Sequence, residues 1–84
     1  MREAAFSPPA RAAYNQLSPE DQAEVSRLVS LIEHDPTTNN PLVTDFIRPP
    51  LVLKLLDNGL WQIIFYVVDD ATVKIHALAP VIDP

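Results

Sequence analysis

Residues 60–79 read LWQIIFYVVDDATVKIHALA, and this stretch decides what the chain can fold into. Aromatic and β-branched residues fill its first half, a polar turn interrupts it, and a second apolar run continues up to Pro80. Two runs of this composition joined by a short polar turn are typical of a β-hairpin. The stretch therefore predicts one strand at 60–68 and another at 73–79.

The residues before this hairpin extend the sheet. Leu51–Leu56 is a further apolar run, broken only by Lys54, and the sequence DNG that follows it at 57–59 is a strong turn signal. A short run at 2–6 is a candidate edge strand. We therefore expect a three- to four-stranded antiparallel sheet whose strands follow one another as a meander.

The N-terminal third of the chain predicts a helical hairpin. Ser7 precedes two prolines and Ser18 precedes Pro19, and serine followed by proline is a favoured helix start. We expect helices from about Pro9 to Leu17 and from Pro19 to about His34. An apolar stripe at helical spacing supports the second helix: Val25, Leu28, Val29 and Ile32. Helices followed by strands indicate an α+β fold with the helices on one face of the sheet.

Residues 35–50 are expected to be a connector. Threonine, asparagine and proline fill its first part, and RPP at 48–50 is an extended lead-in to a strand. A connector of this length exceeds the usual one, which favours a contact with a partner. The alternative is a plain covering loop.

Composition indicates one small globular domain, 1–84. Hydrophobic residues make up 48% of the 84 residues and charged residues 20%, which is enough apolar material for a core. No apolar run approaches the roughly 20 residues of a membrane helix, and the N-terminus lacks a signal-peptide pattern. We therefore expect a cytoplasmic protein without a membrane segment.

The charged and metal-binding residues exclude several kinds of site. The net charge of −5 rules out positive potential around the whole molecule, but it leaves room for a local basic patch. Cysteine is absent, which excludes disulfides and thiolate metal sites. The two histidines, His34 and His76, lie far apart and form no metal motif, so we expect no metal and no cofactor.

Alternation of side chains divides each expected strand into two faces. The set expected against the helices is wholly apolar: Leu51, Leu53, Leu55, Trp61, Ile63, Phe65, Val67, Val73, Ile75 and Ala77. The opposite set mixes polar and apolar residues: Val52, Lys54, Leu56, Gln62, Ile64, Tyr66, Lys74, His76 and Leu78. Such a half-apolar surface commonly marks a protein contact, either with a second copy or with a dedicated partner.

Four segments carry a family resemblance. The sequence FSP at 6–8 resembles a strand that leads into a first helix, LSPE at 17–20 an interhelical turn, and LIEHDP at 31–36 the end of a second helix. GLWQIIFYVVDD at 59–70, followed by VKI, resembles a central hairpin. Together these segments resemble the RelE/ParE toxin superfamily over nearly the whole chain, which would make this protein a divergent member.

The resemblance implies a component of a toxin–antitoxin system. Active members of that superfamily are ribonucleases that cut messenger RNA, usually on the ribosome, or gyrase poisons, and an antitoxin neutralises both. The RNA-cutting members use lysine and arginine on the open face of the sheet, sometimes with tyrosine or histidine, and need no metal. This chain has Gln62 where the hairpin motif usually has arginine, and residues 79–84 contain no basic residue.

The resemblance also gives candidate catalytic residues: Lys54, Tyr66, Lys74 and His76. Lys54 lies on the strand where RNA-cutting members carry a catalytic lysine. Lys54 and Lys74 would hold phosphate oxygens, and His76 or Tyr66 would move the proton. The plainer alternatives are that Lys54 is an edge-strand charge that prevents aggregation and that His76 is a surface histidine.

Two functions follow from these residues. The first is a toxin-like component, active as a metal-independent mRNA endoribonuclease that inhibits translation, with the ribosome and messenger RNA as its targets. The second is a catalytically inactive module on the same fold that forms a homodimer or binds an antitoxin-like protein. Its partner-binding residues would be Val52, Gln62, Ile64, Tyr66 and Leu78.

Overall fold

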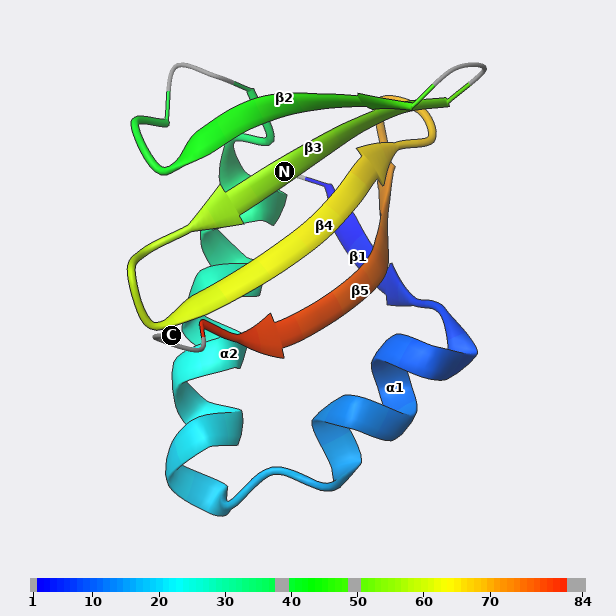
Figure 1. Ribbon diagram of the computed structural model, residues 1–84. Helices are drawn as coiled ribbons and strands as arrows, with labels where there is room; N and C mark the ends of the chain where they lie inside the picture. Colours follow the sequence, from blue (N-terminus) through cyan, green and yellow to red (C-terminus); the bar gives the residue numbers. More distant parts are fainter. Residues whose placement is uncertain (1, 38–39, 49–50, 82–84) are drawn as a thin grey trace.

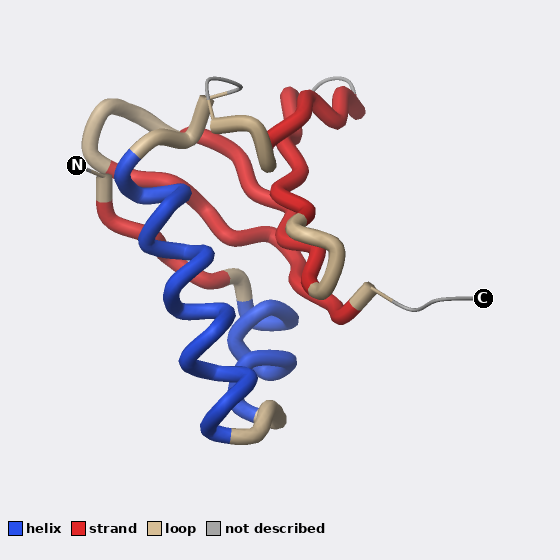
Figure 2. The backbone as a smooth tube through the Cα atoms, turned by 90° about the vertical axis from the view of Figure 1, so that its left-hand side faces the viewer, coloured by secondary structure: helices blue, strands red, loops and turns tan. Residues whose placement is uncertain are grey.

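The computed structural model describes residues 2–37, 40–48 and 51–81. Along the chain, the elements in these ranges are β1 (Glu3–Phe6), α1 (Pro8–Asn15), α2 (Pro19–His34), β2 (Val43–Arg48), β3 (Leu51–Asp57), β4 (Trp61–Val67) and β5 (Thr72–Pro80) (Figure 1). Both helices lie on the same side of the sheet (Figure 2). The α+β fold predicted from the sequence is therefore confirmed.

The sheet is larger and more mixed than the sequence predicts. Its strand order is β1-β5-β4-β3-β2, and the three pairs that join β2 to β5 are antiparallel. The predicted meander is therefore confirmed. The candidate edge strand also forms, as β1, but it pairs with β5 in the parallel direction.

The prediction of a connector over residues 35–50 is wrong from Val43 onward. Residues Val43–Arg48 form β2, which pairs along its whole length with β3, from Val43 opposite Leu56 to Arg48 opposite Leu51. A search for apolar runs misses β2 for two reasons. The strand contains the charged residue Asp45, and two prolines follow its last residue, Arg48.

The helices begin where the serine–proline pairs predict. The Ser7 hydroxyl accepts a hydrogen bond from the backbone N–H of Ala10 at 3.2 Å, and the Ser18 hydroxyl accepts one from Asp21 at 3.2 Å. Each bond satisfies an N–H that the first helical turn leaves unpaired. Helix α2 has the predicted bounds, whereas α1 ends at Asn15, two residues before the predicted Leu17.

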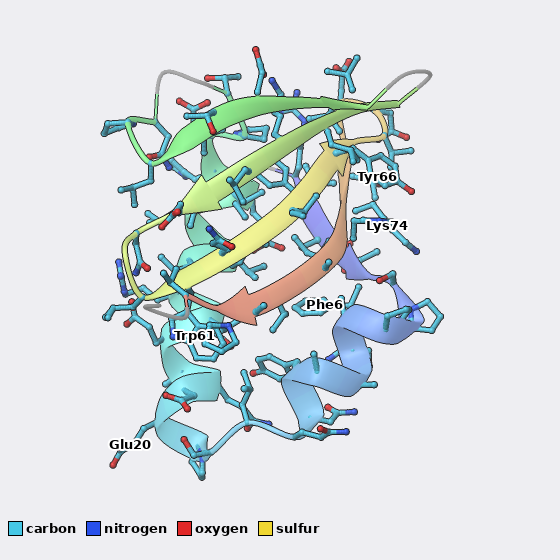
Figure 3. All side chains as sticks on the ribbon, viewed as in Figure 1. Phe6, Glu20, Trp61, Tyr66 and Lys74 are labelled. Carbon is cyan, nitrogen blue, oxygen red and sulfur yellow. The ribbon has the colours of Figure 1, made fainter. Side chains whose placement is uncertain are left out.

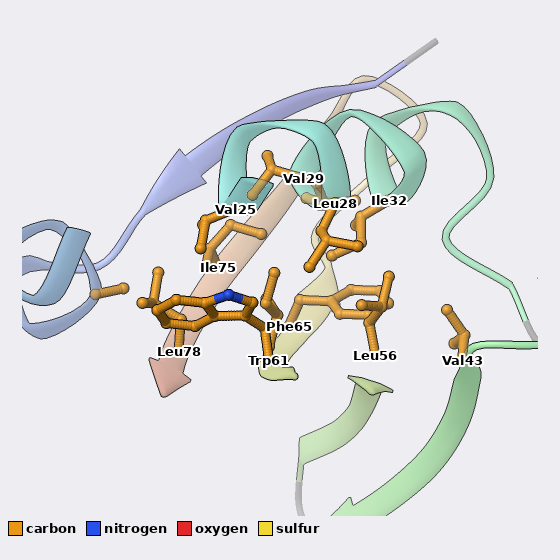
Figure 4. Close-up of a cluster of buried hydrophobic side chains, with 13 residues drawn as sticks. Val25, Leu28, Val29, Ile32, Val43, Leu56, Trp61, Phe65, Ile75 and Leu78 are labelled. Carbon is orange, nitrogen blue, oxygen red and sulfur yellow. The ribbon is translucent and has the colours of Figure 1, made fainter. Parts of the chain in front are cut away.

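The core lies between α2 and the inner face of the sheet (Figure 4). The predicted stripe of α2 is buried, and so is Trp61, which is 7% exposed. The side chains removed completely from solvent come from both layers: Val25, Leu28, Ile32, Leu56, Ile63, Phe65, Val73 and Ile75. Within the described ranges, no helix is long and apolar enough to cross a membrane.

A bulge reverses the predicted faces near the end of β5. Ile64 lies opposite Ala77, and the next residue, Phe65, lies opposite Ile75, which leaves His76 without a cross-strand partner. The extra residue shifts the alternation of side chains along β5. Leu78 therefore lies in the core at 8% exposure, and Ala77 pairs with Ile64 on the other face, so the prediction was wrong for both residues.

The faces of β3 are also reversed relative to the prediction. Leu56 is fully buried in the core opposite Ile63, whereas Leu55 lies opposite Ile64 on the outer face. The same alternation places Lys54 opposite Phe65, on the side of the sheet that carries the helices, and Val52 with it. Apolar residues occupy both faces of β3, so polarity alone could not assign its orientation.

Candidate functional face of the sheet

The face of the sheet that points away from the helices is called the open face below. It consists of Leu55, Asp57, Gln62, Ile64, Tyr66, Lys74, Ala77 and Ala79. Its centre is aliphatic, and a shallow hollow of about 80 Å³ there is lined by Gln62, Ile64, Ala77, Leu78 and Ala79. Polar residues stand at the two ends of this aliphatic centre.

One end of the open face carries Tyr66 and Lys74. These residues lie directly opposite each other on β4 and β5, so their side chains share a face (Figure 3). Both are partly exposed, and neither side chain makes a hydrogen bond or ion pair with another residue in the described parts of the chain. An ammonium group and a phenol are therefore available to a ligand at this end.

The bulge presents His76 close to Lys74 along the chain. The Ser7 hydroxyl donates a hydrogen bond to the His76 carbonyl at 2.8 Å, and the Ser7 N–H donates one to the Ile75 carbonyl at 2.9 Å. Because Ser7 also caps α1, the bulge is tied to the start of that helix. The His76 residue itself is exposed to solvent.

Lys54 is separated from this group by the sheet. It lies on the helix side, where its ammonium contacts the Asp45 carboxylate at 2.7 Å, and its side chain is only 20% exposed. The expectation that Lys54 shares the open face with Tyr66 and Lys74 was therefore wrong. The alternative of an edge-strand charge was wrong too, because β3 lies between β4 and β2, and the charge on the edge strand is that of its partner Asp45.

The other end of the open face carries Gln62 and Asp57, which lie opposite each other on β4 and β3. The Gln62 amide donates a hydrogen bond to the Asp57 carboxylate at 3.2 Å, and the Gly59 N–H donates another at 2.8 Å. These two donors, the backbone N–H first, hold the pKa of the Asp57 carboxyl below its usual range. At the position where the resembled motif has arginine, this chain has an amide that already binds a carboxylate.

Sequence reasoning did not identify Asp57 as part of the candidate functional face. The sequence DNG indicates a turn, and the turn forms, with Gly59 at a φ of 89° that favours glycine. Only the register of β3 against β4 shows that Asp57 also faces Gln62. No signal in the sequence gives that register in advance.

The predicted partner-binding residues divide into three groups. Gln62, Ile64 and Tyr66 lie on the open face, as expected. Val52 is on the helix side but is 58% exposed, and Leu78 belongs to the core. Among the described residues, no group of three histidine, aspartate or glutamate side chains could hold a metal ion.

No protein-family model and no curated protein sequence matches the chain. Solved structures do match. A chain of the archaeal RelE–RelB complex from Pyrococcus horikoshii OT3 superposes with a TM-score of 0.72 at 18% identity, covering 94% of this chain and 93% of that one. A chain of the toxin–antitoxin complex RelBE2 from Mycobacterium tuberculosis gives a TM-score of 0.76 at 18% identity, covering 95% and 98%. The chain therefore has a RelE-like fold.

Proposed function

We propose that this chain is the toxin-like component of a toxin–antitoxin pair and that its open face binds the partner protein. The observation that carries the proposal is the RelE-like fold over almost the whole chain, combined with an open face whose centre is aliphatic. Both similar structures are complexes, of RelE with RelB and of a toxin with its antitoxin. An antitoxin-like protein is the partner of matching chemistry.

The composition of the open face suits a protein better than a nucleic acid. Ile64, Leu55 and the neighbouring alanines offer apolar area, and partly exposed apolar area drives protein association. Lys74 contributes one positive charge, and the Gln62–Asp57 pair at the other end contributes a negative one. A surface that binds RNA backbone needs several clustered cations.

A second candidate is the metal-independent mRNA endoribonuclease. The pair of Tyr66 and Lys74, with His76 nearby on β5, is the observation that favours it. Lys74 would hold a phosphate oxygen, and His76 or Tyr66 would move the proton of the 2′-hydroxyl. Lys54 takes no part in this version, because it lies across the sheet and is paired with Asp45.

The test of the proposal is tightly controlled expression in a bacterium that has no cognate antitoxin, with growth and the rate of protein synthesis as readouts. Arrest by a soluble, folded protein is the expected result, and unperturbed growth would overturn the toxin-like role. Incubation of the purified protein with messenger RNA then separates the two mechanisms. Cleavage that a Lys74→Ala variant abolishes would establish the endoribonuclease.

The binding surface is tested with an Ile64→Asp variant. A charge in the middle of the aliphatic centre should disrupt association there without disturbing the core, because Ile64 points away from the helices. Sedimentation equilibrium of the wild type and of Ile64→Asp measures whether the open face forms the interface of a homodimer. A wild-type dimer that becomes a monomer in the variant would assign the open face to a homodimer, in place of an antitoxin-like partner.

A further inference from the structure

A second hollow in the described part of the chain lies away from the open face, between α1, α2 and β1. Its volume is about 230 Å³. Apolar side chains of Phe6 and Val29 form part of its wall, and Val29 is 7% exposed. Arg11 and Glu33 bring one positive and one negative charge to it. This hollow is called the helix cleft below, and the proposed toxin-like function makes no use of it.

Arg11 is an exposed residue that lines the helix cleft, and its guanidinium has no charged partner among the residues that the structure describes. The guanidinium carbon lies 4.4 Å from the centroid of the Phe6 ring and 5.8 Å from that of Tyr14. These two rings pack edge to face, with centroids 5.6 Å apart (Figure 3 labels Phe6). The ring contacts use none of its N–H donors, and these donors make no hydrogen bond within the described ranges, so they can bind a carboxylate.

Glu33 presents a carboxylate to the same cleft. One of its oxygens, Oε2, accepts a hydrogen bond from the backbone N–H of Ala4 at 2.8 Å, which fixes the side chain against β1. The other oxygen, Oε1, accepts no hydrogen bond from the residues that the structure describes. Glu33 forms no ion pair with Arg11 either, because the ion pairs within the described ranges join other residues.

A cation and an anion that line the same cleft favour a particular kind of ligand. A simple anion would be attracted by Arg11 and repelled by Glu33. A simple cation would be attracted by Glu33 and repelled by Arg11. A zwitterion satisfies both charges at once. The cleft is smaller than the usual range for drug-sized ligands, which limits the ligand to a few heavy atoms beyond its charged groups.

We propose that the helix cleft binds a free α-amino acid with a compact aliphatic side chain. The α-carboxylate binds the Arg11 guanidinium, the α-ammonium binds Glu33 Oε1, and the aliphatic side chain lies against Val29 and Phe6. The hydroxyl of Ser30, which also lines the cleft, is a further hydrogen-bonding group for the ligand.

The test is a titration of the full chain, followed by ¹H–¹⁵N NMR, with three probes: L-valine, acetate and ethylammonium. The expected result is that L-valine shifts the resonances of the cleft residues with a Kd on the order of 1 mM. Acetate and ethylammonium each carry only one of the two charges, so the Kd of each should be at least about tenfold higher than that of L-valine. Absence of shifts with L-valine overturns the proposal, and equal binding of acetate does too, since it would indicate an anion site only.

Two variants assign the charges. Glu33→Gln keeps an oxygen that accepts from Ala4 but removes the charge, so it should weaken L-valine binding and leave acetate binding equal or stronger. Arg11→Gln should abolish the binding of L-valine and of acetate. Arg27→Gln is the matched control, because Arg27 is on α2 but pairs with Glu24 and does not line the cleft. Unchanged L-valine binding in Glu33→Gln overturns the zwitterion assignment.

Discussion

Strand β4 carries two rows of side chains whose surroundings differ. Toward the helices, Trp61, Ile63 and Phe65 are 7%, 0% and 0% exposed and fill the core. On the open face, Gln62 is exposed, and Ile64 and Tyr66 are half-buried. The inner row fixes the fold, since each of its members packs between the sheet and a helix. The outer row contributes less to the core and is free to change with function.

This difference accounts for a fold that persists at 18% identity to the similar structures. The side chain at position 62 can change without cost to the core, because it lies on the outer row, where Gln62 binds Asp57. The inner row must keep its volume and shape, because protein interiors are close-packed. The predictions below test this contrast between the two rows, starting with the largest expected effect.

Phe65→Ala should give the largest loss of stability. Removal of a fully buried aromatic side chain typically costs about 3–5 kcal/mol in free energy of unfolding. Tyr66→Ala is the matched control on the outer row, and its cost should be clearly smaller. Urea unfolding followed by circular dichroism measures both. Equal costs for the two variants would mean that the rows do not differ as described.

The neighbours Leu55 and Leu56 test the orientation of β3. Leu56→Ala should cost about 2–5 kcal/mol, because Leu56 is fully buried, whereas Leu55→Ala should cost less, because Leu55 is half-buried on the open face. The same urea unfolding experiment compares them. A larger cost for Leu55→Ala would support the opposite orientation, which polarity predicts from the sequence.

The lysines on opposite sides of the sheet should separate stability from function. Lys54→Ala removes the contact with Asp45, whose side chain is half exposed, and should lower the free energy of unfolding by about 0.2–1 kcal/mol, the usual range for an ion pair at the surface. Lys74→Ala should leave stability unchanged, since Lys74 has no charged partner among the described residues. Thermal unfolding of both variants provides the measurement, and a greater loss of stability in Lys74→Ala would contradict the structure.

The smallest effect concerns acid. Side-chain hydrogen bonds from Arg27 and from Thr37 lower the pKa of Glu24 and Asp35, and the Gly59 N–H and the Gln62 amide lower that of Asp57. A lowered folded-state pKa stabilises the fold above the unfolded pKa of about 4, and this contribution disappears as the pH falls through the folded value. Stability should therefore be constant from about pH 5 to 7 and decline below about pH 4.

Asp57→Asn serves as the control for the acid prediction. The amide oxygen can still accept from the Gly59 N–H, but the group no longer titrates in this range. Stability of the variant should decline less steeply below about pH 4 than that of the wild type. Identical acid profiles would show that Asp57 does not contribute to the pH dependence.

Much of the fold could be predicted from local signals. Ser7 and Ser18 mark both helix starts, the spacing of Val25, Leu28, Val29 and Ile32 identifies the buried side of α2, and the turn residues locate the hairpins. Each of these signals acts over a few residues, which is why sequence alone reveals it.

The rest depends on contacts between distant segments. Strand β2 has a charged centre and is stabilised by its pairing with β3, so its own residues do not predict a strand. The bulge at His76 is held by Ser7, 69 positions away. If the bulge is ignored, the alternation of side chains along β5 places Leu78 on the wrong face of the sheet. The sequence therefore predicts which residue types make up the candidate site, but it does not predict on which face of the sheet each of these residues lies.

The most direct test of the central claim is the growth of bacteria after controlled expression of the wild type, Lys74→Ala and Lys54→Ala, with no cognate antitoxin present. If the open face is the functional face, wild type and Lys54→Ala should both arrest growth and Lys74→Ala should arrest it less, at equal soluble protein. Loss of arrest in Lys54→Ala, with full arrest in Lys74→Ala, would place the function on the helix side of the sheet and contradict the account.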